Sequence, residues 1–224
     1  MSRISPQVAW SQLAVAYVIS VLLGVLCFAS GLPLIIGGEV ALFLPAGLFA
    51  ALAVHEYAHA AAAVRAGGSV RLIRLSVFYG LTFVDCPDDA PLGLRVWVPL
   101  SGAVASLLAS IPAIPLALVL LPENLAVGGP FAYWAAVNFL IAAVNLLPVE
   151  GLDGYGALAT LVRHLMPARL ASRLLLVVSA LVMSGVVFWA GRRQHWSAWV
   201  VAAAFALTAV LPHVLRRRLG ADRH

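Results

Sequence analysis

The segment from residue 40 to residue 64 restricts the fold of this chain more than any other. It is apolar over about 25 residues, which is long enough to cross a bilayer as a helix. Within it, the run AALAVHEYAHAAAAVR at residues 50–65 places His55, Glu56 and His59 among apolar neighbours. Ionisable groups are costly inside a membrane and mark a functional site there. On a helix the two imidazoles lie one turn apart on one face, so both can reach a single ion. The segment therefore predicts a metal site within the membrane.

The composition supports a membrane protein. Hydrophobic residues make up 63% of the chain and charged residues 10%, whereas a soluble domain carries about 25% charged residues. The 224 residues have room for about six spans of roughly 20 residues each. We therefore expect a single membrane-embedded domain over residues 1–224, with a core at 40–165 and further spans within 174–212.

The expected fold is an all-α polytopic membrane protein with a β-hairpin after its second span. Apolar stretches predict spans at residues 8–29, 40–64, 97–121, from 131 into the NLLPVEGLDG motif at 145–154, 174–190 and 196–212. Pro112 and Pro115 are expected to kink the third span. A loop between the first two spans is predicted from the helix-breaking residues Gly31, Pro33, Gly37 and Gly38.

Residues 65–96 have a different composition from the spans. The run from Val70 to Val84 is rich in β-branched and aromatic residues, and Tyr79 and Gly80 predict a turn within it. We expect a hairpin that lies at the membrane surface or dips into it. Exposed strand edges are not tolerated in lipid, so this hairpin must be covered by protein or line a wet cavity.

Arginine placement predicts the topology. The chain has no lysine, so its 14 basic residues are all arginine. With the N-terminus inside, twelve of them fall on the inner side and only Arg192 and Arg193 on the outer side. Such a bias is typical of cytoplasmic loops in a lipid bilayer. We therefore expect both termini in the cytoplasm and no nucleic-acid partner.

The NLLPVEGLDG motif predicts a second polar site. Pro148 and Gly151 should break the fourth span there, and broken backbone at membrane depth marks binding sites. Asp153 and His55 each precede an arginine by ten residues, so both should lie roughly 15 Å below the inner surface if the segments are helical. The two sites are therefore expected to meet.

The expected constellation has the composition of a catalytic zinc site. Catalytic zinc takes three protein ligands and keeps a position for water, and His55, His59 and Asp153 are the expected ligands of one ion per chain. Zinc lowers the pKa of its water from about 15.7 to roughly 7, and Glu56 can take the proton as that water attacks a peptide carbonyl. Asn145 can donate a hydrogen bond to the oxyanion. Three alternatives remain. His55, Glu56 and His59 can form a polar patch that bonds neighbouring helices, Asp153 can be a turn-capping aspartate, and Asn145 can link two spans.

These motifs, taken in order, carry a resemblance. HEYAH on a membrane helix, a Gly-rich hairpin, a small-residue third span and NLLPVEGLDG resemble the site-2 protease family of intramembrane zinc metalloproteases over residues 40–165. The resemblance implies zinc binding by the two histidines and Asp153, a general base at Glu56, and a substrate or transition-state contact at Asn145. It also implies that a transmembrane substrate is unwound before cleavage. The hairpin is then a candidate substrate-binding edge, with the side chains Arg71, Val77 and Tyr79.

The chain also departs from the family pattern. Glu150 and Gly151 stand where the family often has proline, and Glu150 adds a carboxylate that can face metal, water or solvent. The chain is too short for a PDZ or CBS domain as well, which leaves regulation to a membrane partner or to substrate access. A divalent-metal transporter or a metal-sensing membrane protein is the alternative function. The Ala- and Arg-rich, lysine-free composition indicates a GC-rich prokaryote and hence its cell membrane.

Overall fold

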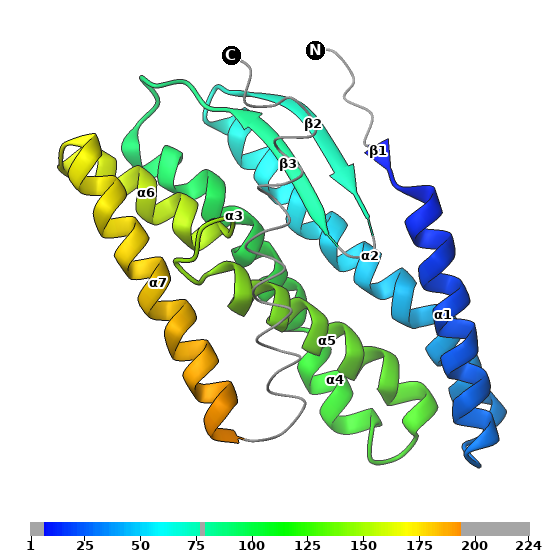
Figure 1. The fold of residues 1–224 in the computed structure, drawn as a ribbon. Coiled ribbons are helices and arrows are strands. Elements are labelled where there is room, and N and C mark those ends of the chain that lie inside the picture. The colour runs from blue at the N-terminus through cyan, green and yellow to red at the C-terminus, as the bar shows by residue number, and fades with distance from the viewer. Residues whose placement is uncertain (1–6, 77–78, 194–224) are drawn as a thin grey trace. The chain divides into compact units, whose positions relative to one another are not determined.

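The structure is a computed structural model that describes residues 7–76 and 79–193. In chain order the elements are β1 (Gln7–Val8), α1 (Trp10–Ala29), α2 (Leu34–Arg65), β2 (Ser69–Leu75), β3 (Gly80–Asp85), α3 (Leu92–Ser110), α4 (Ala113–Leu120), α5 (Leu125–Asn145), α6 (Asp153–Leu165) and α7 (Ala168–Arg193) (Figure 1). The chain divides into two compact units. Among the described residues, one unit holds 7–76, 79–88 and 101–142, and the other holds 89–100 and 143–193.

Within residues 7–76 and 79–193, five helical segments are long and apolar enough to cross a membrane: Trp10–Ala29, Leu34–Arg65, Leu92–Leu120, Leu125–Asn145 and Ala168–Trp189. Each overlaps one of the first five predicted spans, and the sixth, at 196–212, lies outside the described residues. Their surfaces carry large apolar side chains open to the surroundings, as lipid-facing helices require. The chain is an integral membrane protein, and the predicted fold class is confirmed.

The packing of α1 on α2 corrects the predicted loop. Gly37 and Gly38 lie inside α2, and the connection between the helices is limited to residues 30–33. Gly37 meets Gly24 of α1 backbone to backbone. This close contact accounts for a glycine at a helical position of α2. A Cβ on Gly24 would lie 2.3 Å from the Gly37 carbonyl oxygen. Glycine between membrane helices permits such close approach, and the same residue in a sequence reads as a breaker.

The sheet has three strands in the order β1-β2-β3, one more than the predicted hairpin. Strand β1 pairs in parallel with β2 through Val8 and Leu75, so the first predicted span begins too early, and α1 starts at Trp10. Strands β2 and β3 are antiparallel, with a register shift near Val70. Of the two residues predicted to form the turn, Tyr79 lies between the strands and Gly80 is already the first residue of β3. Buried side chains of β2 pack on α2, where Ile73 and Leu75 form a cluster with Ala60.

The third predicted span is two helices, as its prolines indicate. Helix α3 ends at Ser110, and α4 begins after Pro112, which stands at its N-cap position. Helix α5 folds back along this pair, since the Trp134 indole N–H donates to the Ala109 carbonyl at 3.0 Å. A Cβ on Gly128 would lie 2.3 Å from the Leu121 nitrogen, so the returning chain passes close to the end of α4. This arrangement fixes the part of α3 that carries Ser101 to Ser110.

Candidate metal centre

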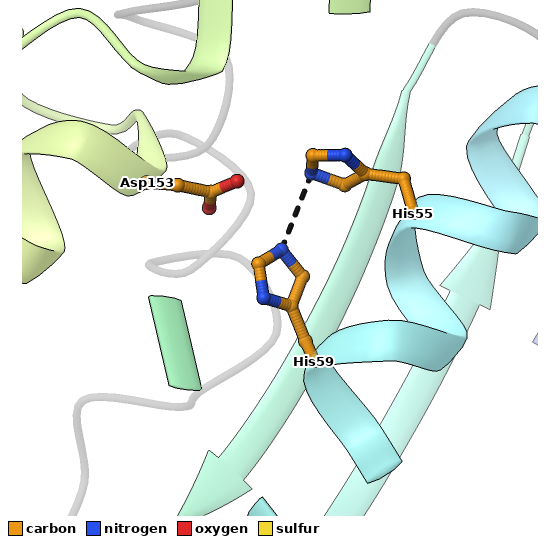
Figure 2. A group of neighbouring side chains, drawn as sticks. All are labelled: His55, His59 and Asp153. Carbon is orange, nitrogen blue, oxygen red and sulfur yellow. Dashed lines mark hydrogen bonds between the residues drawn. The ribbon is translucent and has the colours of Figure 1, made fainter. Parts of the chain in front are cut away.

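Helix α2 positions two histidines as a pair, as their spacing predicts. The rings of His55 and His59 are 3% and 8% exposed. Their Nε2 atoms lie 3.2 Å apart and are joined by a hydrogen bond (Figure 2). The ring planes are nearly perpendicular, at 82°. The four-residue spacing thus brings two ring nitrogens of the same kind to one point on the helix face.

The other nitrogen of each ring meets a serine of α3. His55 Nδ1 lies 3.1 Å from Ser106 Oγ, and His59 Nδ1 lies 3.4 Å from Ser101 Oγ. Both serines are buried. The sequence pointed to them only as small residues that let helices approach. Each imidazole is therefore held on its Nδ1 side by a hydroxyl, and its Nε2 side faces the other ring.

Gly102 of α3 lies directly against the paired nitrogens. A Cβ built on it would be 2.3 Å from His59 Nε2 and 2.8 Å from His55 Nε2, which no real side chain could tolerate. This glycine leaves the space next to both nitrogens free of side-chain atoms from α3. In the sequence Gly102 is one of several small residues of the third span, and only the packing distinguishes it.

Glu56 is buried against the hairpin. A Cβ on Gly80 of β3 would lie 2.4 Å from Glu56 Oε1, so the bare backbone at the start of β3 makes room for this carboxylate. Thr82 Oγ1 donates to the Glu56 main-chain carbonyl at 3.2 Å. Strand β3 thus contacts both the side chain and the main-chain carbonyl of Glu56, the proposed general base.

In the second unit, Asp153 is the first residue of α6, directly after the break that Pro148 and Gly151 predict (Figure 2). Gly151 has φ 96°, a left-handed conformation that suits glycine. Gly154 packs on the loop, where a Cβ would lie 2.2 Å from the Leu146 carbonyl oxygen. The predicted break is confirmed. It presents a half-buried carboxylate at the N-terminus of a helix.

Helix α7 supports this turn, a role that its sequence did not reveal. Val149 and Leu152 are buried in a cluster with three α7 side chains, Val182, Met183 and Val186. Ser179 Oγ donates to the Pro148 carbonyl at 3.0 Å. The Pro148 carbonyl, which lies between α5 and α6, thus accepts its hydrogen bond from a side chain of another helix.

The remaining predicted residues lie around these two regions. Asn145 is the last residue of α5, so the break separates it from Asp153, and Glu150 is exposed within the break. Arg71 of β2 pairs with Asp85 of β3. That pair is about 17 Å along the strand from Gly80, at some 3.3 Å per residue. Tyr79 accepts the Ser76 N–H in the turn. Val77 lies outside the described residues.

The histidine pair has the chemistry of a zinc site. Zinc binds imidazole nitrogen readily, and ligating histidines carry a hydrogen-bond partner on the ring nitrogen that does not face the metal. Both features are present here, together with a glycine that keeps the adjoining space open. These residues therefore fit a divalent ion held by imidazole.

Comparisons with known proteins support the same interpretation. No family model matches the sequence. Over 138 residues the chain is 38% identical to a protein of Mycobacterium tuberculosis named "Putative zinc metalloprotease Rip3", covering 56% of this chain and 34% of that relative. This chain thus spans about a third of the curated relative's length. Its fold is similar to that of the site-2 protease from Methanocaldococcus jannaschii, with TM-score 0.56, 15% identity, and coverage of 87% of this chain and 88% of the other.

Proposed function

We propose that the chain is an intramembrane zinc endopeptidase of the site-2 protease family. Its substrates are transmembrane proteins, cleaved in or near a membrane span. The observation that carries the proposal is the histidine pair of α2, whose Nε2 atoms lie 3.2 Å apart with a serine hydroxyl at each Nδ1. Neither a purely structural helix nor a lipid-facing one needs two imidazoles buried in this way.

The proposed metal site contains one zinc ion per chain, held by His55, His59 and Asp153. By residue type these three side chains form a group that could hold a metal ion. Two imidazoles and one carboxylate leave a coordination position for water, as catalytic zinc sites do. In this proposal the α5–α6 break exists to present Asp153, which would otherwise be only a first-turn aspartate of α6.

The protein's own groups supply the proton transfers. A bound zinc ion acts as a Lewis acid that makes water nucleophilic near neutral pH. Glu56 takes a proton from the attacking water and returns it to the amide nitrogen that leaves. Asn145 donates a hydrogen bond to the oxyanion of the tetrahedral intermediate. The contact of Glu56 with Gly80 suits the first role, because it fixes the carboxylate against rigid backbone.

The proposed substrate site is the free edge of β3. Strand β3 is an outer strand of the described sheet, and it begins beside Glu56. An unwound substrate segment can pair with such an edge through main-chain hydrogen bonds. The predicted contacts Arg71, Val77 and Tyr79 belong to this proposal. A photo-crosslinking residue at Phe83 should then capture substrate, and one at Leu72, its partner on the central strand, should not.

The remaining features of the proposal concern topology and regulation. The arginine distribution supports cytoplasmic termini in a prokaryotic cell membrane. Regulation by a membrane partner is also proposed. The transporter alternative requires a path of further ionisable groups. Among the described residues, the buried ionisable ones are His55, Glu56 and His59, and these belong to the proposed zinc site. None of the observations favours the transporter alternative.

The proposed activity is tested with Glu56→Gln, which should keep the metal and lose the proton acceptor. Membrane proteomes of cells producing the wild type or Glu56→Gln are compared, and both purified proteins are assayed for zinc. We expect equal zinc content and a set of membrane proteins that stay uncut only with the variant. Tyr57→Phe, at the exposed neighbouring position, is the matched control and should cleave like the wild type. Cleavage by Glu56→Gln at the wild-type rate would contradict the proposal.

A further inference from the structure

Ser101 and Ser106 are the polar side chains on which the histidine pair rests. They lie five residues apart on α3, and each places its Oγ near the Nδ1 of a different imidazole, at 3.4 Å and 3.1 Å. The rings of His55 and His59 meet at their Nε2 atoms, next to Gly102 of α3. One short stretch of α3 therefore contacts all four ring nitrogens of the pair.

The hydrogen bonds of this pair require a definite distribution of protons. A neutral imidazole carries one N–H and one lone pair. The Nε2–Nε2 hydrogen bond needs an Nε2–H on one ring and a bare Nε2 on the other, so the two rings are different tautomers. To bind one ion through Nε2, both rings must carry the proton on Nδ1 instead. Binding of one ion through both Nε2 atoms would therefore require one ring to change tautomer.

A serine hydroxyl suits this change, because it is both a donor and an acceptor. The serine beside the ring protonated on Nε2 donates to the bare Nδ1 of that ring. The serine beside the other ring accepts from its Nδ1–H. With metal bound, each of the two hydroxyls would accept a hydrogen bond from the Nδ1–H of the imidazole that it faces. A carboxylate, the common partner of ligating histidines, could only accept and would bury another charge in the membrane.

We propose that Ser101 and Ser106 are positioning residues for the metal, which hold the imidazoles of His55 and His59 in the Nδ1–H tautomer with Nε2 directed at the ion. This inference rests on the proposed zinc site and assigns it a second layer on α3. Losing a partner of this kind weakens metal binding by about 10–100-fold in known sites. Ser110 provides a control on the same helix, since it is equally buried and its Oγ donates to the Leu107 carbonyl at 2.6 Å.

The test is a zinc titration of the full chain in detergent micelles, in competition with a chromophoric chelator. We expect Ser106→Ala and Ser101→Ala each to weaken zinc binding by about 10–100-fold. Ser110→Ala should bind within about twofold of the wild type, because its hydroxyl stays within its own helix. The visible absorption of the Co2+ forms should change in Ser106→Ala and not in Ser110→Ala. Thermal unfolding of the metal-free proteins checks that all variants are folded.

A second pair of variants separates the hydroxyl from the packing. Ser106→Thr and Ser106→Val have the same shape, so they perturb the packing equally, and only threonine keeps the hydroxyl. Threonine should bind zinc more tightly than valine by about tenfold or more. Equal affinities in this pair, or equal losses in Ser106→Ala and Ser110→Ala, would overturn the inference and leave the zinc site intact. A wild-type protein that binds no zinc would instead contradict the proposed function itself.

Discussion

The two halves of α2 use glycine contacts for different purposes. In residues 34–49 the contacts hold helices together, since Gly37 meets the backbone of Gly24 and Gly47 receives the ring of Tyr133. In residues 50–65 the glycines belong to the partner elements. Gly102 lies against the imidazoles and Gly80 against the Glu56 carboxylate. The same lack of a side chain brings backbone to backbone in one half and leaves room for a functional group in the other.

Burial follows the same division. The first half buries only Gly37 and Pro45, whereas the second half buries His55, Glu56 and His59 together with small alanines. Burying three ionisable groups in a membrane segment is unfavourable unless they are paired or coordinate an ion. The second half is thus adapted for chemistry, and the first half supports its position. Substitutions in the two halves should therefore change different measurable quantities.

Among the glycine substitutions that compare these contacts, Gly102→Ala is expected to have the largest effect, which is on zinc affinity. The added Cβ would lie within 3 Å of both Nε2 atoms, so the imidazoles must turn away from the ion. We expect a loss of about 100-fold, the upper end of what a disturbed ligand orientation costs. The control is Gly93→Ala on the same helix, where nothing lies within 4 Å. Zinc titration measures both, and equal affinities would remove the distinction between the two halves.

The first half of α2 should respond in stability instead. In Gly37→Ala the new Cβ would lie 2.6 Å from the Gly24 carbonyl oxygen, so α1 must shift. Overpacking of this kind costs about 1–3 kcal/mol. Gly38→Ala, at the next position with open space, should be neutral or slightly stabilising because alanine favours helix. Thermal unfolding in micelles gives the comparison. A large loss of zinc affinity in folded Gly37→Ala protein would show that the halves are not separable.

Gly80→Ala should separate the general base from the metal within the second half. Its Cβ would overlap the Glu56 side chain, so the carboxylate must leave its place beside β3. We expect cleavage to slow by about tenfold, or 1.4 kcal/mol in the barrier, and zinc affinity to stay unchanged. The assay uses a substrate identified with Glu56→Gln. Parallel losses of cleavage and zinc would mean that β3 supports the metal site as a whole.

The smallest effect is expected at the end of the hairpin opposite Gly80, where Asp85 pairs with Ser69 just beyond the C-terminus of α2. The hydrogen bond from the Arg71 guanidinium, followed by its charge, lowers the pKa of the Asp85 carboxyl. A lowered pKa in the folded state adds stability above the unfolded value, and that stability is lost as pH falls through the folded value. Both side chains are exposed, at 56% and 45%, so the gain is small.

Asp85→Asn tests this pair. At neutral pH the wild type should unfold at a slightly higher temperature than the variant, and the two should converge in acid. Zinc affinity should be equal in both proteins at neutral pH. A wild-type advantage that persists in acid would show that the ion pair is not its source.

Much of the site was predictable from the sequence, because it depends on local spacing. The four-residue interval of His55 and His59 fixes their common helix face, and Pro148 with Gly151 fixes the break before Asp153. β-Branched residues marked the hairpin. These features need only backbone geometry. The structure confirms the common helix face of the histidines, the break before Asp153 and the hairpin.

The features that were missed depend on packing between elements. Gly37 reads as a loop residue until Gly24 is placed against it. Strand β1 has two residues and no periodicity to detect. Ser101 and Ser106 carried a weak signal, since they are polar side chains in a span otherwise rich in apolar residues. Only the position of α3 beside α2 shows that they meet the imidazoles.

The proposed zinc site combines two imidazoles of α2 with the Asp153 carboxylate in one ion's coordination. Zinc titration of the purified chain tests it with three variants, His55→Ala, Asp153→Ala and, as a control, Asp85→Asn. We predict one zinc per chain in the wild type and in the control, and no binding by His55→Ala or Asp153→Ala at zinc concentrations that saturate the wild type. Asp153→Ala protein that binds zinc as tightly as the wild type would contradict the account.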